Sequence, residues 1–478
     1  MESIWSKGIE LKNYTSLKGD IKAHTVVIGG GIAGLLTAYR LKEKGIKAII
    51  IEAETICSGQ TKNTTAKITS QHGAIYNKII SNYGEKAARQ YAAANEKAIS
   101  EYEQIIEKYN IDCHFERKNA ILYSVNDSEI IKKEAEAAKR AGINCYVTNK
   151  TELPFPVKAA LVFRNQAQFN PLEFLSAIAD NLKIYENTSV TKIADNIVYT
   201  ENGTVTAENI VFACHYPFVN FPGLYFLRMS QERSYVVSSK WNGELTGMYI
   251  DAGKGLSFRA YKNEILIGGG AHRTGKTDNS NPFDMLIKKG KMMFSDFNET
   301  AEWSAQDCIT LDGLPYIGRL SAAAPNIFVA TGFNKWGMTS AMVGADIISD
   351  MICGRDTSAY SVFSPSRFSI FAAAKNLCTN TKETAKGFAK HLKQANYKAE
   401  DIKTGTAGII KYQGKKAGAY KDENGKLYIV SLTCPHLKCE LEWNDATKTW
   451  DCPCHGSRYD YQGRLVDNPA QQNSILIN

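Results

Sequence analysis

Residues 434–459 read CPHLKCELEWNDATKTWDCPCHGSRY. This stretch contains two short pairs, Cys434-x-His436 and Cys452-x-x-His455, with fifteen residues between His436 and Cys452. Each pair places two metal ligands on one tight loop, and two such loops can close over a small metal centre from opposite sides. Two cysteines and two histidines suit either a tetrahedral zinc ion or a [2Fe–2S] cluster with the cysteines on one iron and the histidines on the other.

Three further features of this stretch favour the iron–sulfur cluster. The ligands run Cys-His and then Cys-His, whereas zinc fingers usually run Cys-Cys and then His-His. Each loop carries an extra cysteine, Cys439 or Cys454, which is able to cross-link the loops. Hydroxyl side chains follow the last ligand at Ser457 and Tyr459. The stretch therefore resembles the Rieske iron–sulfur domain, specifically its high-potential form with a disulfide bond between the loops.

The Rieske resemblance implies a role for each residue of the motif. The implied cluster ligands are Cys434, His436, Cys452 and His455, and the implied disulfide bond joins Cys439 to Cys454. Ser457 and Tyr459 match positions that donate hydrogen bonds to the sulfurs of the cluster. Residues 467–470 resemble the proline loop that covers such a cluster. Lys438 stands where this class usually has glycine, so a positive φ would strain it.

A second motif lies near the N-terminus, where residues 25–28 (TVVI) form a short β-branched run followed at once by GGGIAGLLTAYRLKEKG. This pattern predicts a strand, a glycine turn and an amphipathic helix. The glycines Gly29-x-Gly31-x-x-Gly34 therefore lie where a dinucleotide fold requires them, with the pyrophosphate at the helix N-terminus. Glu52 ends the next predicted strand and can accept hydrogen bonds from a ribose.

The long polar loop after Glu52, Ile56–Gly73, favours FAD over NAD. It resembles the loop that wraps the ribityl chain and flavin in the FAD-dependent D-amino-acid oxidase superfamily, which includes sarcosine and glycine oxidases. Asp312–Gly318 and Asn326–Gly354 resemble the closing segment of that superfamily. The resemblance extends from Thr25 to Gly354. It implies FAD contacts at Gly29, Gly31, Gly34, Glu52, Thr65, Val190, Gly313, Gly332, Gly337 and Met338.

The middle of the chain predicts a second, antiparallel sheet. Apolar and polar residues alternate between Tyr216 and Thr274, as in strands of a substrate domain laid over the flavin. The predicted fold is α/β plus all-β: a Rossmann-like FAD-binding domain with an antiparallel-sheet substrate domain, then a small Rieske β-sandwich. We expect the FAD and substrate domains in residues 1–360, a basic, partly helical connector in 361–402 and the Rieske domain in 403–478.

Catalytic residues are less clearly marked than the cofactor motifs. Lys67 and Arg259 are cations that could contact substrate or flavin, and His72 and His272 are histidines that could take a proton near neutral pH. The alternative for Lys67 and Arg259 is an ordinary surface or ion-paired role, and isolated histidines are more often structural residues. Oxidases of this superfamily frequently need no protein base, so the resemblance requires none here.

Composition and charge restrict the class of protein. A chain of 478 residues is too long for one ordinary hydrophobic core. The sequence has no run of eighteen apolar residues of the kind that spans a bilayer. The N-terminus shows no secretory signal pattern, so we expect a cytoplasmic protein. Residues 361–426 carry thirteen Lys and Arg against five Asp and Glu, within a formal net charge of +8 for the chain. This surplus leaves an acidic redox partner or peripheral membrane contact open, whereas no nucleic-acid motif accompanies it.

These observations predict a dehydrogenase-type oxidoreductase. We expect a small organic substrate, an amine or amino acid, to reduce FAD, and the Rieske cluster to pass the electrons to an external protein or quinone. A non-enzymatic redox sensor or assembly factor and an NAD(P)H-dependent flavin reductase are the alternatives, although the reductase lacks a second dinucleotide motif. A Rieske oxygenase is disfavoured because the remaining histidines are far apart in sequence.

Overall fold

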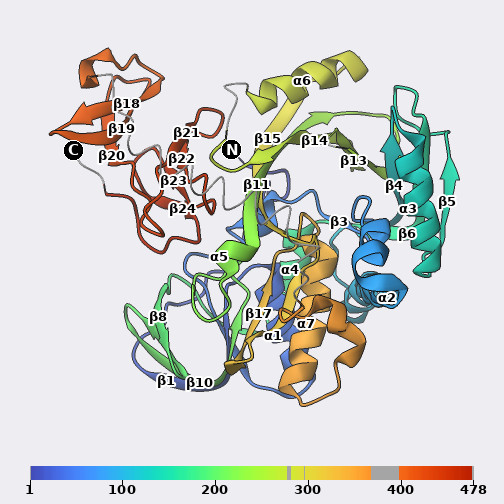
Figure 1. Ribbon diagram of the computed structural model, residues 1–478, viewed down its shortest axis with the longest axis horizontal. Coiled ribbons are helices and arrows are strands. Elements are labelled where there is room, and N and C mark those ends of the chain that lie inside the picture. The colour runs from blue at the N-terminus through green and yellow to red at the C-terminus, as the bar shows by residue number, and fades with distance from the viewer. Residues whose placement is uncertain (1, 254, 277–280, 295, 368–397, 476–478) are drawn as a thin grey trace.

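The computed structural model describes residues 2–253, 255–276, 281–294, 296–367 and 398–475. Figure 1 shows a parallel-sheet region with helices at the bottom, a second sheet at the upper right and a small all-β region with the C-terminus at the upper left. Most of the predicted connector helix lies outside the described residues. The predicted domain boundaries therefore stay predictions.

The first sheet is organised around β1 (Ile21–Ile28), whose buried β-branched end pairs in parallel with β2 (Ala48–Ile51) and β10 (Gly203–Phe212). The strand order is β16-β17-β10-β1-β2-β7, and the hairpin of β8 and β9 extends the sheet beside β10. The other strands are β7 (Lys183–Tyr185), β8 (Val190–Ala194), β9 (Ile197–Thr200), β16 (Tyr316–Ser321) and β17 (Ala324–Thr331).

Helices pack on this sheet. Helix α1 (Ile32–Glu43) follows β1 through the glycine turn and packs against α7 (Gly337–Ile352) and α4 (Pro171–Ala179). Helix α2 (Tyr76–Tyr109) packs against α7 and α3 (Ser128–Arg140), and its path breaks at Gly84, which has φ 82°. None of the helices in the described part of the chain is long and apolar enough to cross a membrane.

The second sheet contains the antiparallel strands predicted between Tyr216 and Thr274. Its strand order is β15-β11-β14-β13-β12-β4-β6-β3, and β5 pairs with β6. The pairs are antiparallel except β12 with β4, which is parallel. The strands are β3 (Lys67–Ile68), β4 (Glu116–Ser124), β5 (Cys145–Thr148), β6 (Ala159–Gln168), β11 (Met229–Lys240), β12 (Gly247–Asp251), β13 (Ser257–Tyr261), β14 (Glu264–Arg273) and β15 (Glu299–Thr310). Two further helices are α5 (Tyr225–Arg228) and α6 (Pro282–Met293).

The C-terminal region consists of two small antiparallel sheets. One has the order β18-β19-β20 and the other β21-β22-β23-β24. Trp450 and Tyr459 are fully buried in their shared core, together with Leu441. The strands are β18 (Ala407–Tyr412), β19 (Lys415–Lys421), β20 (Leu427–Ser431), β21 (Glu442–Asn444), β22 (Thr449–Asp451), β23 (Arg458–Asp460) and β24 (Leu465–Asp467). The predicted fold class, α/β followed by an all-β Rieske region, is confirmed.

Candidate functional site

A cavity of about 580 Å³ lies where the two larger sheets and the C-terminal region meet. Its walls include the β1–α1 turn, the loop after β2, parts of β11, β14 and β15, and the turn before α7. Residues 465–468, 470 and 471 of the C-terminal region complete the lining. Segments that are far apart in sequence therefore line one cavity.

The glycine turn brings backbone to the edge of this cavity. A Cβ at Gly34 would lie 1.9 Å from the carbonyl oxygen of Gly29, so close packing of helix on turn requires glycine there. Gly31 lines the cavity. A Cβ on this residue would have one neighbouring atom within 4 Å, Thr61 Oγ1 at 3.1 Å. Glu52 also lines it, and its carboxylate accepts hydrogen bonds from Gly30 N at 2.6 Å and Glu54 N at 3.0 Å. The glycine turn together with the Glu52 carboxylate fits the pyrophosphate and ribose of FAD.

The other FAD residues implied by resemblance divide into two groups. Thr65, Val190, Gly332, Gly337 and Met338 line the cavity, whereas Gly34 and Gly313 do not. Gly313 instead follows Asp312, whose buried carboxylate pairs with Arg367 at 3.0 Å and accepts from Tyr83 Oη at 2.8 Å. The segment Asp312–Gly318 therefore anchors Arg367, in the chain that follows α7.

The four catalytic candidates lie in different environments. Lys67 lines the cavity and donates to Thr65 Oγ1 at 3.2 Å. Burial, with a smaller contribution from Arg259, lowers the pKa of Lys67 to about 7. Arg259 is fully buried outside the lining and donates to Gln168 Oε1 and to backbone carbonyls of Thr65 and Phe169.

Both candidate histidines are held by hydrogen bonds away from the cavity lining. His72 contacts Tyr91 Oη through Nδ1 and Thr69 O through Nε2, each at 2.6 Å, and burial lowers its pKa to about 3. Its ring stacks on Trp336, which does line the cavity. His272 Nε2 lies 3.0 Å from Tyr235 Oη. Of the four candidates, the structure therefore brings only Lys67 to the cavity wall.

A charged group lies at the cavity wall, and the sequence alone marked only one of its members, Lys335, as one of several side chains in the glycine turn before α7. Lys335 Nζ lies 3.1 Å from Glu232 Oε2 and 3.1 Å from Ser234 Oγ, and all three residues line the cavity. Asp307 lines it as well, and burial raises the pKa of Asp307 to about 6. These residues belong to β11, β15 and the turn before α7, so no local pattern could have linked them.

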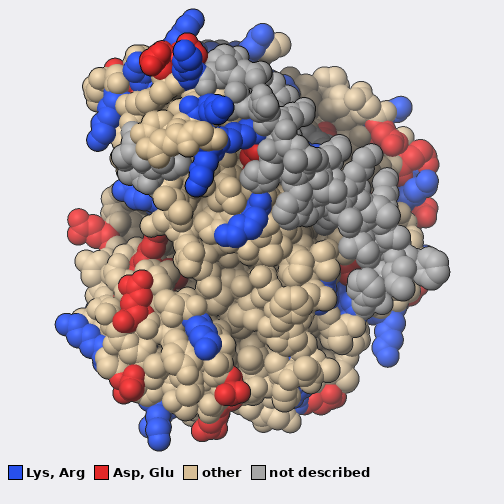
Figure 2. All heavy atoms as spheres, turned by 60° about the vertical axis from the view of Figure 1, so that its left-hand side comes forward, with Lys and Arg blue, Asp and Glu red and all other residues tan. Residues whose placement is uncertain are grey.

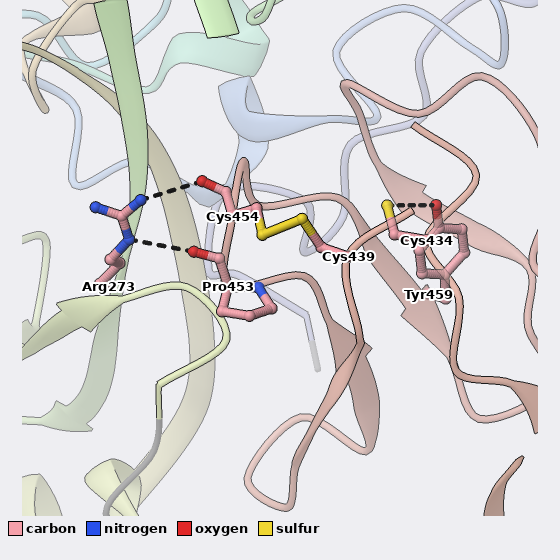
Figure 3. The surroundings of a disulfide bond; sticks show 6 residues. All are labelled: Arg273, Cys434, Cys439, Pro453, Cys454 and Tyr459. Carbon is pink, nitrogen blue, oxygen red and sulfur yellow. Dashed lines mark hydrogen bonds between the residues drawn. A yellow bond between two sulfur atoms is a disulfide. The ribbon is translucent and has the colours of Figure 1, made fainter. Parts of the chain in front are cut away.

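The second site is formed by two loops of the C-terminal region, each closed by backbone hydrogen bonds. Lys438 N donates to Cys434 O at 3.0 Å in the first loop, and Gly456 N donates to Cys452 O at 2.9 Å in the second. Cys439 and Cys454 form a disulfide bond between the loops (Figure 3). The sulfur of Cys452 lies within 4.8 Å of both disulfide sulfurs.

The two histidines of these loops face each other with unused ring nitrogens. The ring centroids of His436 and His455 are 5.0 Å apart. The Nδ1 atom of each is buried and has no hydrogen-bond partner among the described residues. Burial lowers the pKa of His436 to about 4 and that of His455 to about 3, so both rings are neutral and can donate a lone pair. Two such nitrogens beside buried Cys434 and Cys452 fit a [2Fe–2S] cluster with mixed ligands.

Hydroxyl groups and an unusual backbone position surround these ligands. Tyr459 Oη lies 3.7 Å from Cys434 Sγ (Figure 3), and Ser457 Oγ accepts from Ala470 N at 3.0 Å. Lys438 has φ 59°, which is the left-handed conformation expected where related domains have glycine.

Two glutamines on β11 and β15 of the second sheet hold the second loop. Gln231 Nε2 donates to His455 O at 2.8 Å and to Asn468 O at 2.9 Å. Gln306 Nε2 donates to Gly456 O at 2.9 Å and to Gln231 Oε1 at 2.6 Å. A Cβ at Gly456 would lie 2.6 Å from the Cβ of Gln231, so the loop and β11 are in direct contact. Sequence reasoning missed both glutamines because isolated amides on strands carry no motif.

Two further contacts join the same surfaces. Arg273 donates to the carbonyl oxygens of Pro453 and Cys454 at 3.2 and 3.1 Å (Figure 3). Asn468 Nδ2 donates to the carbonyl oxygens of Cys214 and Tyr216, each at 3.0 Å. The proline loop therefore lines the cavity and also bonds the segment after β10, where Cys214 lines the same cavity.

Comparison with known proteins agrees with both sites. Residues 24–351 match the DAO family of FAD dependent oxidoreductases, and residues 393–477 match the Rieske [2Fe-2S] domain. The chain belongs to this FAD-dependent oxidoreductase family, and its C-terminal part is a Rieske domain. The protein is thus an oxidoreductase that binds FAD and a [2Fe–2S] cluster.

Three known proteins illustrate these similarities. It is 36% identical to YhfW of Bacillus subtilis (strain 168), which is named as a Rieske 2Fe-2S iron-sulfur protein, over 98% of this chain and 96% of the relative. It is 21% identical to gamma-glutamylputrescine oxidoreductase of Escherichia coli (strain K12), over 71% of this chain and 86% of that protein. Glycine oxidase from Geobacillus kaustophilus superposes with a TM-score of 0.61 at 18% identity, over 73% of this chain and 99% of the oxidase.

Proposed function

We propose that the protein is a dehydrogenase that oxidises an amine or amino acid with FAD and passes the electrons through its Rieske cluster to an external acceptor. The observation that carries this proposal is the contact between the two cofactor sites. The proline loop of the Rieske region lines the flavin cavity, and Gln231 bonds the ligand loop at His455. An oxidase that reduced O₂ at its flavin would need no such contact.

The residues of each site have separate roles in this proposal. Gly29, Gly31 and Glu52 hold the FAD nucleotide, while Gly337 and Met338 present the N-terminus of α7, whose dipole favours negative charge on a reduced flavin. The four loop ligands, Cys434, His436, Cys452 and His455, hold the cluster. When bound, FAD supplies two-electron oxidation of a C–H bond and the cluster supplies one-electron transfer.

The charged group at the cavity wall supports an amine or amino-acid substrate. Glu232 and Asp307 offer carboxylates to a cationic amine, and Lys335 can pair with a substrate carboxylate. Lys67, with a pKa of about 7, can hold or release a proton inside the cavity near neutral pH. Lys335 lies between Glu232 and Ser234, so a bound carboxylate would compete with an existing ion pair rather than meet a free cation.

Anaerobic stopped-flow mixing tests the proposal. The oxidised holoprotein is mixed with a panel of amines, amino acids, NADH and NADPH, and bleaching of the flavin and cluster bands is followed at separate wavelengths. We expect an amine or amino acid to bleach the flavin first and the cluster second. Rapid bleaching by NADH or NADPH alone, or no bleaching by any amine or amino acid, contradicts the proposed reaction.

Two variants separate the chemical step from electron transfer. Gln231→Leu should slow cluster bleaching while leaving flavin bleaching unchanged, because it removes the bonds to His455 and Asn468 but does not line the cavity. Glu232→Gln should instead slow flavin bleaching. If Gln231→Leu left the rate of cluster bleaching unchanged, the loop contact would not be the route for electrons.

A further inference from the structure

The lining of the cavity is acidic, although the protein is basic overall. The chain has a formal net charge of +8, and the face shown in Figure 2 has a group of Lys and Arg above a broad area of uncharged side chains. The cavity lining includes two lysines, Lys67 and Lys335, but six acidic residues: Glu52, Glu54, Glu232, Asp251, Asp307 and Asp467. The excess of acidic groups is therefore a property of the cavity, and it favours a cationic ligand.

Asp307 differs from the other acidic residues of the lining because its carboxylate has no partner. The other five each accept a hydrogen bond or pair with a cation. Among the described residues, no hydrogen bond or ion pair reaches the carboxylate of Asp307. Burial raises the pKa of Asp307 to about 6, although nearby Lys335 acts in the opposite direction. A carboxylate without a partner at the wall of a cavity indicates that the ligand supplies the partner.

Asp307 on β15 lies directly opposite Glu232 on β11, and we call these two residues the carboxylate pair. Residues opposite each other on antiparallel strands share one face of the sheet, with their Cβ atoms roughly 4.5–5.5 Å apart. Like charges in this position destabilise a sheet unless a cation neutralises them. Lys335 Nζ lies 3.1 Å from Glu232 Oε2, so one lysine faces two carboxylates. The pair therefore keeps a net negative charge when both carboxylates are ionised, and a second cation would neutralise it.

A nitrogen held by the carboxylate pair is not the nitrogen that reacts. In the oxidation of an amine, the C–H bond beside the nitrogen breaks, two electrons leave for the flavin as hydride, and the nitrogen lone pair forms the new C=N bond. The reacting nitrogen must therefore have lost its extra proton. A nearby carboxylate has the opposite effect, because it favours the protonated form of an amine. The carboxylate pair is thus suited to a second nitrogen, which stays cationic throughout the reaction.

We propose that the substrate is an amine with a second cationic group, such as a diamine, and that Asp307 and Glu232 hold this second group while the first nitrogen is oxidised. This inference rests on the proposed function for the reaction at the first nitrogen. Asp307 then determines specificity, since its charge distinguishes substrates by what they carry at the far end. A carboxylate in that place would meet two like charges, because Lys335 is already paired with Glu232.

Three amines of equal chain length test the second group. Pentane-1,5-diamine, pentylamine and 5-aminopentanoate share one primary amine and end in a cation, a methyl group and a carboxylate, respectively. The comparison is repeated with the corresponding compounds of three and four carbons. Bleaching of the flavin in the oxidised holoprotein is followed by anaerobic stopped flow. We expect one of the diamines to react at least about tenfold more efficiently than the monoamine of its length, and the amino carboxylate to react least.

The variant Asp307→Asn removes one charge of the carboxylate pair and keeps the size of the side chain. We expect the preference for the diamine over the monoamine to fall at least about tenfold. The matched control is Glu299→Gln, because Glu299 lies on the same strand, is exposed and does not line the cavity. This control should keep the preference. An unchanged preference in Asp307→Asn, or no preference in wild type at any chain length, would overturn the proposal. Loss of FAD from Asp307→Asn with the preference retained would overturn it by assigning the carboxylate to the cofactor.

A binding measurement separates this inference from the proposed function. The holoprotein is first reduced with dithionite, so that it cannot oxidise an amine, and binding of each compound is measured by anaerobic equilibrium dialysis. We expect the diamine to bind wild type and Glu299→Gln at least about tenfold more tightly than the monoamine, and Asp307→Asn to lose this difference. Equal binding of diamine and monoamine by wild type would reject the second-cation site. Preferential binding of the diamine without any bleaching of the oxidised flavin would instead reject the proposed function and leave the site in place.

Discussion

The hydroxyl oxygen of Tyr459 lies 3.7 Å from the sulfur of Cys434, and the side chain of Tyr459 is fully buried. Ser457 lies immediately before the same strand, β23, and its Oγ accepts from Ala470 N at 3.0 Å, which leaves its hydrogen available to a sulfur of the cluster. Both hydroxyl groups are therefore positioned to stabilise the extra negative charge of the reduced cluster.

Removing these two hydroxyls should lower the reduction potential of the cluster. Rieske centres span roughly −150 to +300 mV, and hydrogen bonds to their sulfurs raise the potential. We expect the wild type in the upper half of that range and a clearly lower value in Ser457→Ala/Tyr459→Phe, with iron content unchanged. Redox titration followed by EPR measures both. An unchanged potential in the double variant would make the hydroxyls purely structural.

Replacing either cluster histidine should remove the cluster and leave the flavin. In His436→Ala or His455→Ala one iron would lose one of the two unpartnered Nδ1 atoms that fit it as ligands. Wild type should contain about two irons and two acid-labile sulfides per chain, with the rhombic EPR signal of a mixed-ligand cluster after reduction. Each variant should lack this signal and stay yellow. One zinc per chain without sulfide in wild type would contradict the Rieske assignment.

Filling the glycine turn should prevent FAD binding. In Gly31→Val the new side chain projects from a residue at the cavity wall, where the pyrophosphate would lie. Glu52→Ala should weaken binding by roughly 1–3 kcal/mol, because charged hydrogen bonds are lost. FAD content and titration of the apoprotein measure the two effects. Retention of the EPR signal in both variants is the control for folding of the Rieske region.

Glu134 should make stability depend on pH near neutrality. It is fully buried on α3, and its carboxylate accepts from the backbone N–H groups of Tyr76 and Asn77 at 2.7 and 3.0 Å. Burial raises the pKa of Glu134 from 4.5 to about 7 in spite of these bonds. The folded protein therefore binds this proton more tightly than the unfolded chain. Its contribution to stability is complete below pH 4.5 and is lost as the pH rises through 7.

The loss amounts to roughly 3 kcal/mol, from about 1.4 kcal/mol for each pH unit of the shift. Glu134→Gln should remove this part of the pH dependence, so its melting temperature should fall less than that of wild type between pH 5 and pH 8. Thermal unfolding followed by flavin fluorescence measures the difference. Identical pH profiles for the two proteins would show that Glu134 titrates normally.

Much of the cofactor chemistry was predictable because its residues are close in sequence. Cys434, His436, Cys452 and His455 belong to two tight loops, and a small cluster needs its ligands in pairs on such loops. The turn from Gly29 to Gly34 is equally local, since one strand, one turn and one helix contain it. Even the left-handed backbone of Lys438 followed from comparing one position with the glycine usual there.

The rest of the site depends on contacts between distant segments, which periodicity and spacing do not encode. Glu232 and Lys335 meet only because β11 and the turn before α7 border one cavity, and Gln231 reaches His455 across more than two hundred residues of chain. His72 and Arg259 have residue types suited to catalysis, yet folding surrounds them with hydrogen-bond partners away from the cavity wall. Local spacing specifies which groups can bind a cofactor, whereas burial and long-range packing establish which side chains face the substrate and which face solvent.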